Sequence, residues 1–396
     1  MPGSIAASIV RALALTASAA LLWCAAAAAQ PSFASADGCG KREVRRGDRC
    51  ENTRTVRSHV LVLARQEMDE SDLKAVILKA KVGDRNVVFR ALGHSMTGVP
   101  ATRDMHFRTG AVSIAYIGTL LLQLDEEGKL SVDDTLSEYF PAYPNADRIT
   151  LRMLANTTSG YADYVAEGLP IEDDVFRAWR PQELIDFGLS RPAACEPGTC
   201  WHYSHTNFVI LSEVISQATG KPVRKLMRRR ILRPLGLRDT HSSRTAAIPN
   251  PVLHAFSSER GVYEDSTFWN PSWSLGRGEV MTSNVKDLER SAVAIGKGEL
   301  LSRRAHREQL APLTANLPPL SPDAYYGIGV VVRNGWVFQN PSFNGFSAVM
   351  AYLPSRRISI AVTSTNGPNS SEDRHTEELF DRITRYLAPG ASFSGD

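Results

Sequence analysis

The stretch HFRTGAVSIAYIGTLLLQLDEEGKL, residues 106–130, carries the clearest structural signal in this chain. From Ala111 to Leu124 its apolar residues recur at helical spacing, and Gly128 is a natural C-terminal stop. We therefore expect a helix over this run, ending near Gly128.

Segments rich in β-forming residues lie on both sides of this helix in the sequence. Residues 75–93 form two such runs around a Gly-Asp turn, and residues 326–340 form two more around Asn-Gly, a strong hairpin signal. Residues 346–354 and 357–366 are two further strands, followed by an amphipathic helix over 371–387. The pattern predicts an α/β (α+β) fold with one mixed, mainly antiparallel sheet, flanked by helices.

Helices and loops dominate the middle of the chain, which we expect to form a helical subdomain over about 150–310. One amphipathic helix ends at Gly220, and the next, VRKLMRRRIL, begins after Pro222 and stops at Arg233-Pro234. Its run of basic residues is typical of a solvated helix face, and a contact with an anionic polymer is the alternative.

Residues 1–36 have the composition of a secretory signal peptide. Arg11 is the only charged residue before Asp37, an apolar run rich in Ala and Leu follows it, and small-residue cleavage patterns end at Ala29 and Ala36. The alternative is a membrane anchor, because the run approaches spanning length. No second apolar run of that length appears, so we expect no stable membrane span after cleavage and a secreted or extracytoplasmic protein, in the periplasm or cell envelope.

Four cysteines remain after the expected cleavage, in two couples that are close in sequence. In an exported protein, Cys39–Cys50 and Cys195–Cys200 are the obvious disulfides among three possible pairings. The first would staple a loose basic arm over 37–57. The second closes the loop CEPGTC, which is followed by His202 and His205, so a zinc site is the alternative.

The overall composition is that of an ordinary globular protein. The chain has 396 residues, of which 43% are hydrophobic and 22% charged, with a formal net charge of +3. This charge is too small to indicate a nucleic-acid partner. The sequence contains no glycine-rich phosphate loop and no convincing metal spacing, so we expect no cofactor and no metal.

Several segments, in order, resemble the serine β-lactamase and penicillin-binding-protein family, including class C β-lactamases, D-alanyl-D-alanine carboxypeptidases and related esterases. They are FRTGAV with LLLQLDEEGKLSVDDTLSEYFP, then ITLRMLANTTSGYADY, PGTCWHYSHTNFVILSEVISQATGKPV, ILRPLGLRDT, GEVMTSNVKDL and NGFSAVMAYLPSRRISIAVTSTN. The resemblance implies a β-lactamase/transpeptidase-like domain over 58–390.

The resemblance also locates the family's first motif, Ser-x-x-Lys, in which the lysine amine activates the serine. Counting from the Phe-Arg-x-Gly lead-in, the serine position is Ala111 and the lysine position is Ile114, so both reactive groups are missing. Ser113 is a candidate substitute nucleophile, but two residues turn about 200° around a helix, and Ser113 should point nearly away from the Ala111 face.

The family's second motif, Tyr-x-Asn, corresponds to Tyr203-Ser204-His205. Tyr203 and His205 are candidate acid–base residues, and the plainer interpretation is that the tyrosine packs while the histidine makes one structural hydrogen bond. The third motif, usually Lys-Thr-Gly or His-x-Gly, corresponds to Gln339-Asn340-Pro341. Gln339 and Asn340 can hydrogen-bond a ligand, but they lack the charge that holds a carboxylate.

Three interpretations follow from these departures from the family's three motifs. The first is a catalytically impaired pseudoenzyme that binds a cell-wall peptide or a partner protein in its remnant cleft. The second is an active serine hydrolase with a rebuilt site, acting on small esters or amides as an esterase, carboxypeptidase or β-lactamase-like enzyme. The third is a purely structural protein whose cleft has filled in.

Overall fold

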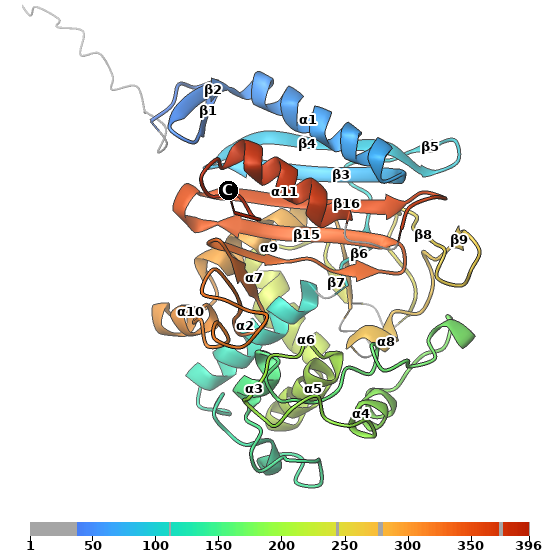
Figure 1. Ribbon diagram of the computed structural model, residues 1–396, viewed down its shortest axis with the longest axis vertical. Helices are drawn as coiled ribbons and strands as arrows, with labels where there is room; N and C mark the ends of the chain where they lie inside the picture. Colours follow the sequence, from blue (N-terminus) through green and yellow to red (C-terminus); the bar gives the residue numbers. More distant parts are fainter. Residues whose placement is uncertain (1–37, 111, 243–244, 276–279, 372–374, 396) are drawn as a thin grey trace, which may run out of the picture. The chain divides into compact units, whose positions relative to one another are not determined.

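Strands from the two ends of the chain pair directly in one antiparallel sheet, where β16 (Ile358–Asn366) lies against β3 (Leu73–Val82) (Figure 1). The computed structural model describes residues 38–110, 112–242, 245–275, 280–371 and 375–395. The expected signal peptide over 1–36 and the nucleophile position Ala111 therefore lie outside the described residues.

The described residues form one nine-stranded sheet with the order β11-β12-β13-β15-β16-β3-β4-β5, and β14 also pairs with β15. The remaining members are β4 (Arg85–Met96), β5 (Val99–Pro100), β11 (Ala324–Tyr326), β12 (Val331–Arg333), β13 (Trp336–Gln339), β14 (Ser342–Phe343) and β15 (Phe346–Leu353). The central strands β15 and β16 are buried along their whole length, because helices cover both faces of the sheet.

Both hairpins that the turn signals predict are present. Strands β3 and β4 are joined around Gly83-Asp84, and β12 and β13 are joined by Asn334-Gly335, with Arg333 opposite Trp336. Asn334 and Gly335 have φ values of 47° and 78°, as a two-residue hairpin turn of this hand requires.

Two layers of helices cover the sheet (Figure 1). Helices α1 (Thr53–Glu70) and α11 (His375–Leu387) share one apolar cluster with the sheet, built from side chains such as Val60 and Phe380. Helices α2 (Val112–Glu126) and α9 (Val285–Lys297) belong to a second, larger cluster that extends into the helical region. The predicted fold class is therefore confirmed.

Helices and short strands occupy the chain between the two halves of the sheet. The helices are α3 (Leu151–Ala155), α4 (Pro181–Leu189), α5 (His205–Thr219), α6 (Val223–Met227), α7 (Arg233–Leu235), α8 (Ser272–Leu275) and α10 (Arg303–Gln309). Short strands accompany them: β6 (Phe107–Arg108), β7 (His241–Ser242), β8 (Phe256–Ser257), β9 (Glu264–Asp265) and β10 (Met281–Ser283). The order β6-β10-β7 forms a small sheet beside the start of α2.

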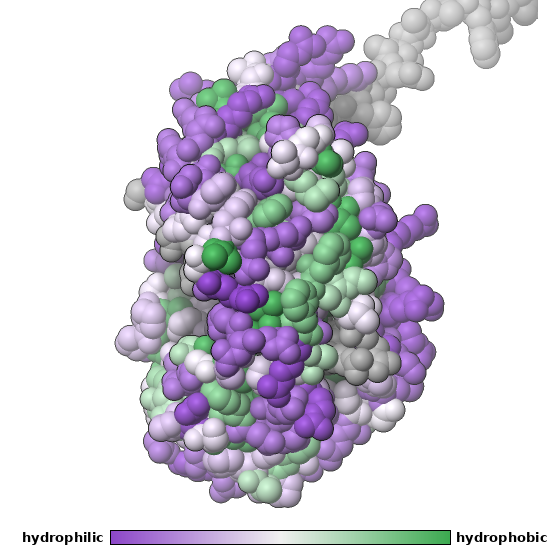
Figure 2. Space-filling model, turned by 90° about the vertical axis from the view of Figure 1, so that its right-hand side faces the viewer, coloured by the Kyte–Doolittle hydropathy of each residue, from purple (hydrophilic) through white to green (hydrophobic). Residues whose placement is uncertain are grey.

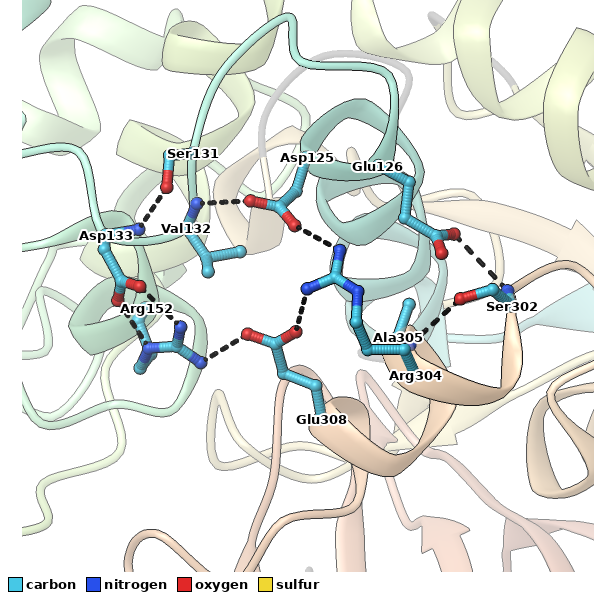
Figure 3. Close-up of polar contacts among 10 residues, drawn as sticks. All are labelled: Asp125, Glu126, Ser131, Val132, Asp133, Arg152, Ser302, Arg304, Ala305 and Glu308. Carbon is cyan, nitrogen blue, oxygen red and sulfur yellow. Dashed lines mark hydrogen bonds and ion pairs between the residues drawn. The ribbon is translucent and has the colours of Figure 1, made fainter.

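Helix α2 is almost wholly buried, and both of its sides are held by neighbouring elements. A Cβ added to Gly118 would lie 2.4 Å from the Ile328 carbonyl oxygen, so only glycine allows the chain at 328–329 to approach this closely. At its last turn, Asp125 pairs with Arg304 of α10, Arg304 pairs with Glu308, and Glu308 pairs with Arg152 of α3 (Figure 3). This chain of ion pairs fixes the C-terminal end of α2.

The basic arm expected to be loose is in part regular. Strands β1 (Glu43–Arg46) and β2 (Arg49–Asn52) form a hairpin that the Cys39–Cys50 disulfide closes, and α1 already begins at Thr53. The Arg85 guanidinium donates to backbone carbonyls of Gly40 and Glu43, which ties the hairpin to the edge of β4.

The single basic helix expected after Pro222 is instead divided. Helix α6 ends at Met227, a π-helical turn η3 (Arg228–Leu232) follows, and α7 begins at Arg233. Pro234 explains the change, because it has no N–H for the helical ladder and its ring clashes with the preceding turn.

Among the described residues, no helix has both the length and the apolar character that crossing a bilayer requires. On the face in Figure 2, apolar residues are interspersed with polar ones. The exposed large apolar side chains are Val62, Val99, Phe176, Val262, Phe268 and Leu313.

Candidate functional site

The structure brings the three motif regions together, as the family resemblance implies. A Cβ added to Gly110, just before α2, would lie 2.8 Å from the Cβ of Pro341, so the third-motif stretch packs against the start of the nucleophile helix. The ring of Tyr203 lies 6.4 Å from that of Tyr326, whose strand belongs to the same sheet as Gln339. The site is thus the meeting point of α2, the start of α5 and the edge of the sheet.

The start of α2 contributes packing. Ile114, at the lysine position, has an exposed fraction of 0% and belongs to the main apolar cluster. Ser113 is equally buried, and its hydroxyl has no hydrogen-bond partner among the described residues. The structure therefore does not bring Ser113 into hydrogen-bond contact with Tyr203 or His205.

Two loops that lie side by side support the second motif. The Ala194 N–H donates to the Gly160 carbonyl at 2.8 Å, and the Gly198 N–H donates to the Thr158 carbonyl at 2.8 Å. The expected Cys195–Cys200 disulfide closes the second loop, with the two Cα atoms 6.2 Å apart. Both sulfurs are in this bridge, so neither serves as a thiolate ligand and the alternative zinc site is not formed from them.

Side chains at the start of α5 attach this helix to the loop that precedes it. The Ser204 and Thr206 hydroxyls both donate to the Ala162 carbonyl, at 2.9 and 2.6 Å. The His205 backbone N–H donates to Asp163 Oδ1 at 3.2 Å, so this carboxylate accepts a free donor at the helix N-terminus.

The Asp163 carboxylate also holds the ring of His205. His205 Nδ1 lies 3.0 and 3.1 Å from the two Asp163 oxygens, and the side chains are 15% and 8% exposed. Burial by itself would raise the pKa of Asp163, but the neighbouring His205 outweighs it and the pKa lies below its ordinary value. The described residues offer no hydrogen-bond partner to His205 Nε2.

Sequence analysis did not identify Asp163. One signal was present: it is the only acidic residue in the segment TTSGYADY, residues 157–164, which the family resemblance had already singled out. What the sequence does not reveal is that the loop carrying it folds back onto the start of α5, about 40 residues later.

Aromatic rings surround the second motif. Tyr203 meets His205 edge-on at a centroid distance of 5.1 Å, and Trp273 of α8 lies 6.4 Å from His205 and stacks on Phe343 at 4.9 Å. Burial raises the pKa of Tyr203 well above its ordinary value. This shift disfavours the phenolate, the form of Tyr203 that could accept a proton.

The two third-motif amides have partners within the fold. Gln339 is buried, and its side-chain N–H donates to the Gly329 carbonyl at 2.7 Å. The Asn340 side-chain N–H donates to the Glu377 carboxylate of α11. These two side-chain donors therefore serve the sheet and its covering layer, and the Asn340 amide is engaged on the α11 side.

Two indole N–H groups near the site were also missed by sequence analysis. Nε1 of Trp201 and Nε1 of Trp273 are shielded from solvent, and neither has an acceptor among the described residues. Their sequence signal is weak, since tryptophans in a helical region are usually packing residues. A bound carbonyl or carboxylate would satisfy such donors.

One cluster of three potential metal ligands occurs among the described residues, and it lies elsewhere. Donor atoms of Glu67, His375 and Glu378 are within 4.8 Å of one another, on α1 and α11. Arg382 Nε already lies 3.1 Å from Glu67 Oε2 and balances that charge. The cluster belongs to the helical layer opposite α2, so it contributes nothing to the site.

The arrangement has a histidine oriented by a buried carboxylate, as acid–base catalysis requires, but lacks the nucleophile and the amine at the family positions. Five surface hollows formed by the described residues are lined by other segments, and none of the five includes Tyr203, His205 or Gln339.

Comparison with known proteins gives a family assignment for this chain. The family model described as Beta-lactamase matches residues 63–383. Penicillin-binding protein 4* of Bacillus subtilis (strain 168) is 23% identical over 366 residues, 85% of this chain and 77% of the relative. The D-alanyl-D-alanine-carboxypeptidase/endopeptidase AmpH of Escherichia coli (strain K12) is 24% identical over 327 residues, 75% of this chain and 81% of the relative.

A similar solved structure is a D-stereospecific amidohydrolase from Streptomyces sp., with 24% identity and a TM-score of 0.72, covering 84% of this chain and 99% of that one. This likeness independently supports the fold. Because the family model spans most of the sequence, the chain belongs to the beta-lactamase family of serine hydrolase relatives.

Proposed function

We propose that this protein is a secreted, catalytically impaired member of its family that binds a cell-wall peptide at the remnant site. The observation that carries the proposal is Ile114, which occupies the lysine position and is completely buried in the apolar core. No amine can act beside a nucleophile at this point of α2.

The other two motifs support the same conclusion. Burial raises the pKa of Tyr203, so the phenolate, the form that could accept a proton from a nucleophile, is disfavoured further. Gln339, Asn340 and Pro341 carry no positive charge to hold a substrate carboxylate. Tyr203 and Gln339 are instead arranged as packing and bracing residues.

Binding is supported by the donors that the fold leaves without acceptors. Trp201 Nε1 and Trp273 Nε1 are buried donors without partners among the described residues, at a cost of about 1–3 kcal/mol each. The ring of His205, held by Asp163 and partly exposed, lies among the same aromatic side chains. Peptide carbonyls are acceptors of the right kind, and the aromatic rings around these donors suit the flat faces of amide groups.

Export is part of the proposal. Two disulfides, Cys39–Cys50 and Cys195–Cys200, suit an oxidising compartment, and the apolar run within residues 1–36 suits a signal peptide.

Intact-mass spectrometry tests the catalytic part. The mature protein is incubated with a penicillin and, separately, with a serine-reactive fluorophosphonate. We expect no adduct from protein that melts cooperatively. A stoichiometric adduct on one serine would support the alternative, an active hydrolase whose rebuilt site uses the Asp163–His205 pair.

Titration with a synthetic peptide ending in D-alanyl-D-alanine, followed by calorimetry, tests the binding part. Trp273→Phe removes the N–H and retains a ring to stack on Phe343, and we expect it to weaken binding about threefold to tenfold. Trp336→Phe is the matched control, because Trp336 lies in the cluster on the other face of the sheet. No binding by the wild-type protein, or equal losses in both variants, would contradict a peptide site here.

A further inference from the structure

A strongly basic hollow lies between α6, η3 and α7 on one side and β7 with its preceding loop on the other. The residues that line it are Arg224, Lys225, Arg228, Leu232, Arg233, Gly236, Leu237, Arg238, Thr240, His241 and Ser242. None of these residues belongs to the candidate site around His205.

The π-helical turn aligns three of the arginines. Arg224 and Arg228 are four residues apart, so they share a face of an α-helix. Arg233 is five residues after Arg228, and its backbone N–H donates to the Arg228 carbonyl across the π turn. The i→i+5 spacing therefore places Arg233 below Arg228 on the same side of the helix. In an ordinary α-helix, a residue five positions later would lie on a different side.

Among the residues that the structure describes, no acidic one lines the hollow. Among the described residues, Arg224, Lys225, Arg228, Arg233 and Arg238 form no ion pair, whereas Arg230 of the same segment pairs with Glu127. Behind the lining, the Asp287 carboxylate of α9 accepts from the Asp239 backbone N–H and from the Thr240 hydroxyl. The hollow thus gathers like charges at an energetic cost that a bound anion would offset.

The geometry of this charge selects a class of ligand. Guanidinium groups match the oxygens of phosphate with two parallel hydrogen bonds. From Arg224 to Arg233 the helical rise is roughly 12–14 Å, which is longer than one phosphate ion. A chain carrying several phosphates would contact the whole row.

The surroundings argue against a lipid surface and against single-stranded nucleic acid. Membrane-binding basic surfaces also present large apolar side chains, and none of the exposed large apolar residues of the described chain lines this hollow. Single-stranded nucleic acids require aromatic rings for base stacking, and the lining contains no Phe, Tyr or Trp.

We propose that this hollow is a binding site for a linear, water-soluble polymer bearing repeated phosphate groups. The proposal is independent of the function proposed for the His205 region. Arg224, Arg228 and Arg233 contact successive phosphates along the helix, while Arg238 and His241 close the site from the opposite wall.

Calorimetric titration with inorganic polyphosphate, at an ionic strength held constant with sodium chloride, tests this. We compare the wild type with Arg228→Gln/Arg233→Gln, and with the control Lys221→Gln/Arg229→Gln. The control removes the same charge from exposed residues of the same segment that do not line the hollow. We expect the first variant to bind about tenfold or more weakly, and the control to bind within about twofold of the wild type.

Thermal unfolding without ligand verifies that both double variants fold, and the single variant Arg238→Gln, from the opposite wall, gives a second measure. Three results would overturn the proposal: no binding of polyphosphate by the wild type, equal weakening in the variant and the control, or binding confined to vesicles containing phosphatidylglycerol. The first result denies the site, the second indicates diffuse charge, and the third indicates a membrane surface.

Discussion

The starts of α2 and α5 occupy corresponding places at the site, and they differ completely in chemistry. At α2, Ser113 and Ile114 are fully buried, and the hydroxyl has no partner among the described residues. At α5, His205 remains partly exposed and is held by the Asp163 carboxylate. The α2 end of the site has thus become part of the core, while the α5 end retains titratable groups with defined partners.

Restoring the family's serine and lysine at the start of α2 should have the largest effect on stability. Ala111→Ser with Ile114→Lys places an ammonium group in an apolar environment, and we expect a loss of about 3–5 kcal/mol in the free energy of unfolding. We also expect no hydrolysis of a chromogenic cephalosporin, because the third motif still lacks a cation. Denaturant unfolding and a rate assay measure the two effects.

Ile114→Met is the control for this variant, because it preserves apolar volume and should cost less than about 1.5 kcal/mol. A double variant that melts like the wild type and hydrolyses the cephalosporin would mean that the start of α2 is a catalytic site lacking only two side chains.

The two paired loops that support the start of α5 offer the next test. Gly160 has a φ of 81°, and a Cβ there would lie 2.1 Å from the Cys195 carbonyl oxygen. Gly160→Ala should therefore separate the two paired loops and cost about 2–4 kcal/mol, measured by denaturant unfolding.

Gly168→Ala is the matched control for Gly160→Ala, since Gly168 has a φ of 78° with nothing within 4 Å of an added Cβ. The difference between the two variants isolates the steric contact with the disulfide loop. Equal losses would show that backbone strain alone, and not the loop pairing, sets the effect.

The smallest effect should come from the Asp163–His205 pair. The pKa of Asp163 is lowered in the folded protein, so its contribution is fully present above the ordinary value of about 4 and is lost as the pH falls through the folded value. Asp163→Asn should lower the melting temperature by about 2–6 °C at neutral pH, and the difference should shrink on acidification below about pH 4.

Asp173→Asn is the control, because Asp173 is exposed in a short 3-10 turn and its replacement should leave the melting temperature unchanged at each pH. A difference between wild type and Asp163→Asn that stays constant down to pH 2 would show that the carboxylate acts through packing and not through its charge.

Local patterns were enough to predict most of the architecture. The Asn334-Gly335 hairpin, the helix ending at Gly220 and the pairing of cysteines close in sequence all depend on residues near one another in the chain. The division of the basic helix at η3 was not predicted, although Pro234 marks its cause. The expected loose arm is partly regular because Arg85, from β4, contacts its carbonyls.

The fold class and the absence of a reactive pair at 111 and 114 could be predicted without a structure, because both depend on residue identity at fixed spacing. The five cationic side chains of the hollow all lie within residues 224–238, so this basic run is also visible in the sequence. The contact of Asp163 with His205 and that of Asn340 with Glu377 appear only in the folded structure. These two contacts join segments distant along the chain, and such contacts are set by packing of the whole domain, which no local pattern encodes.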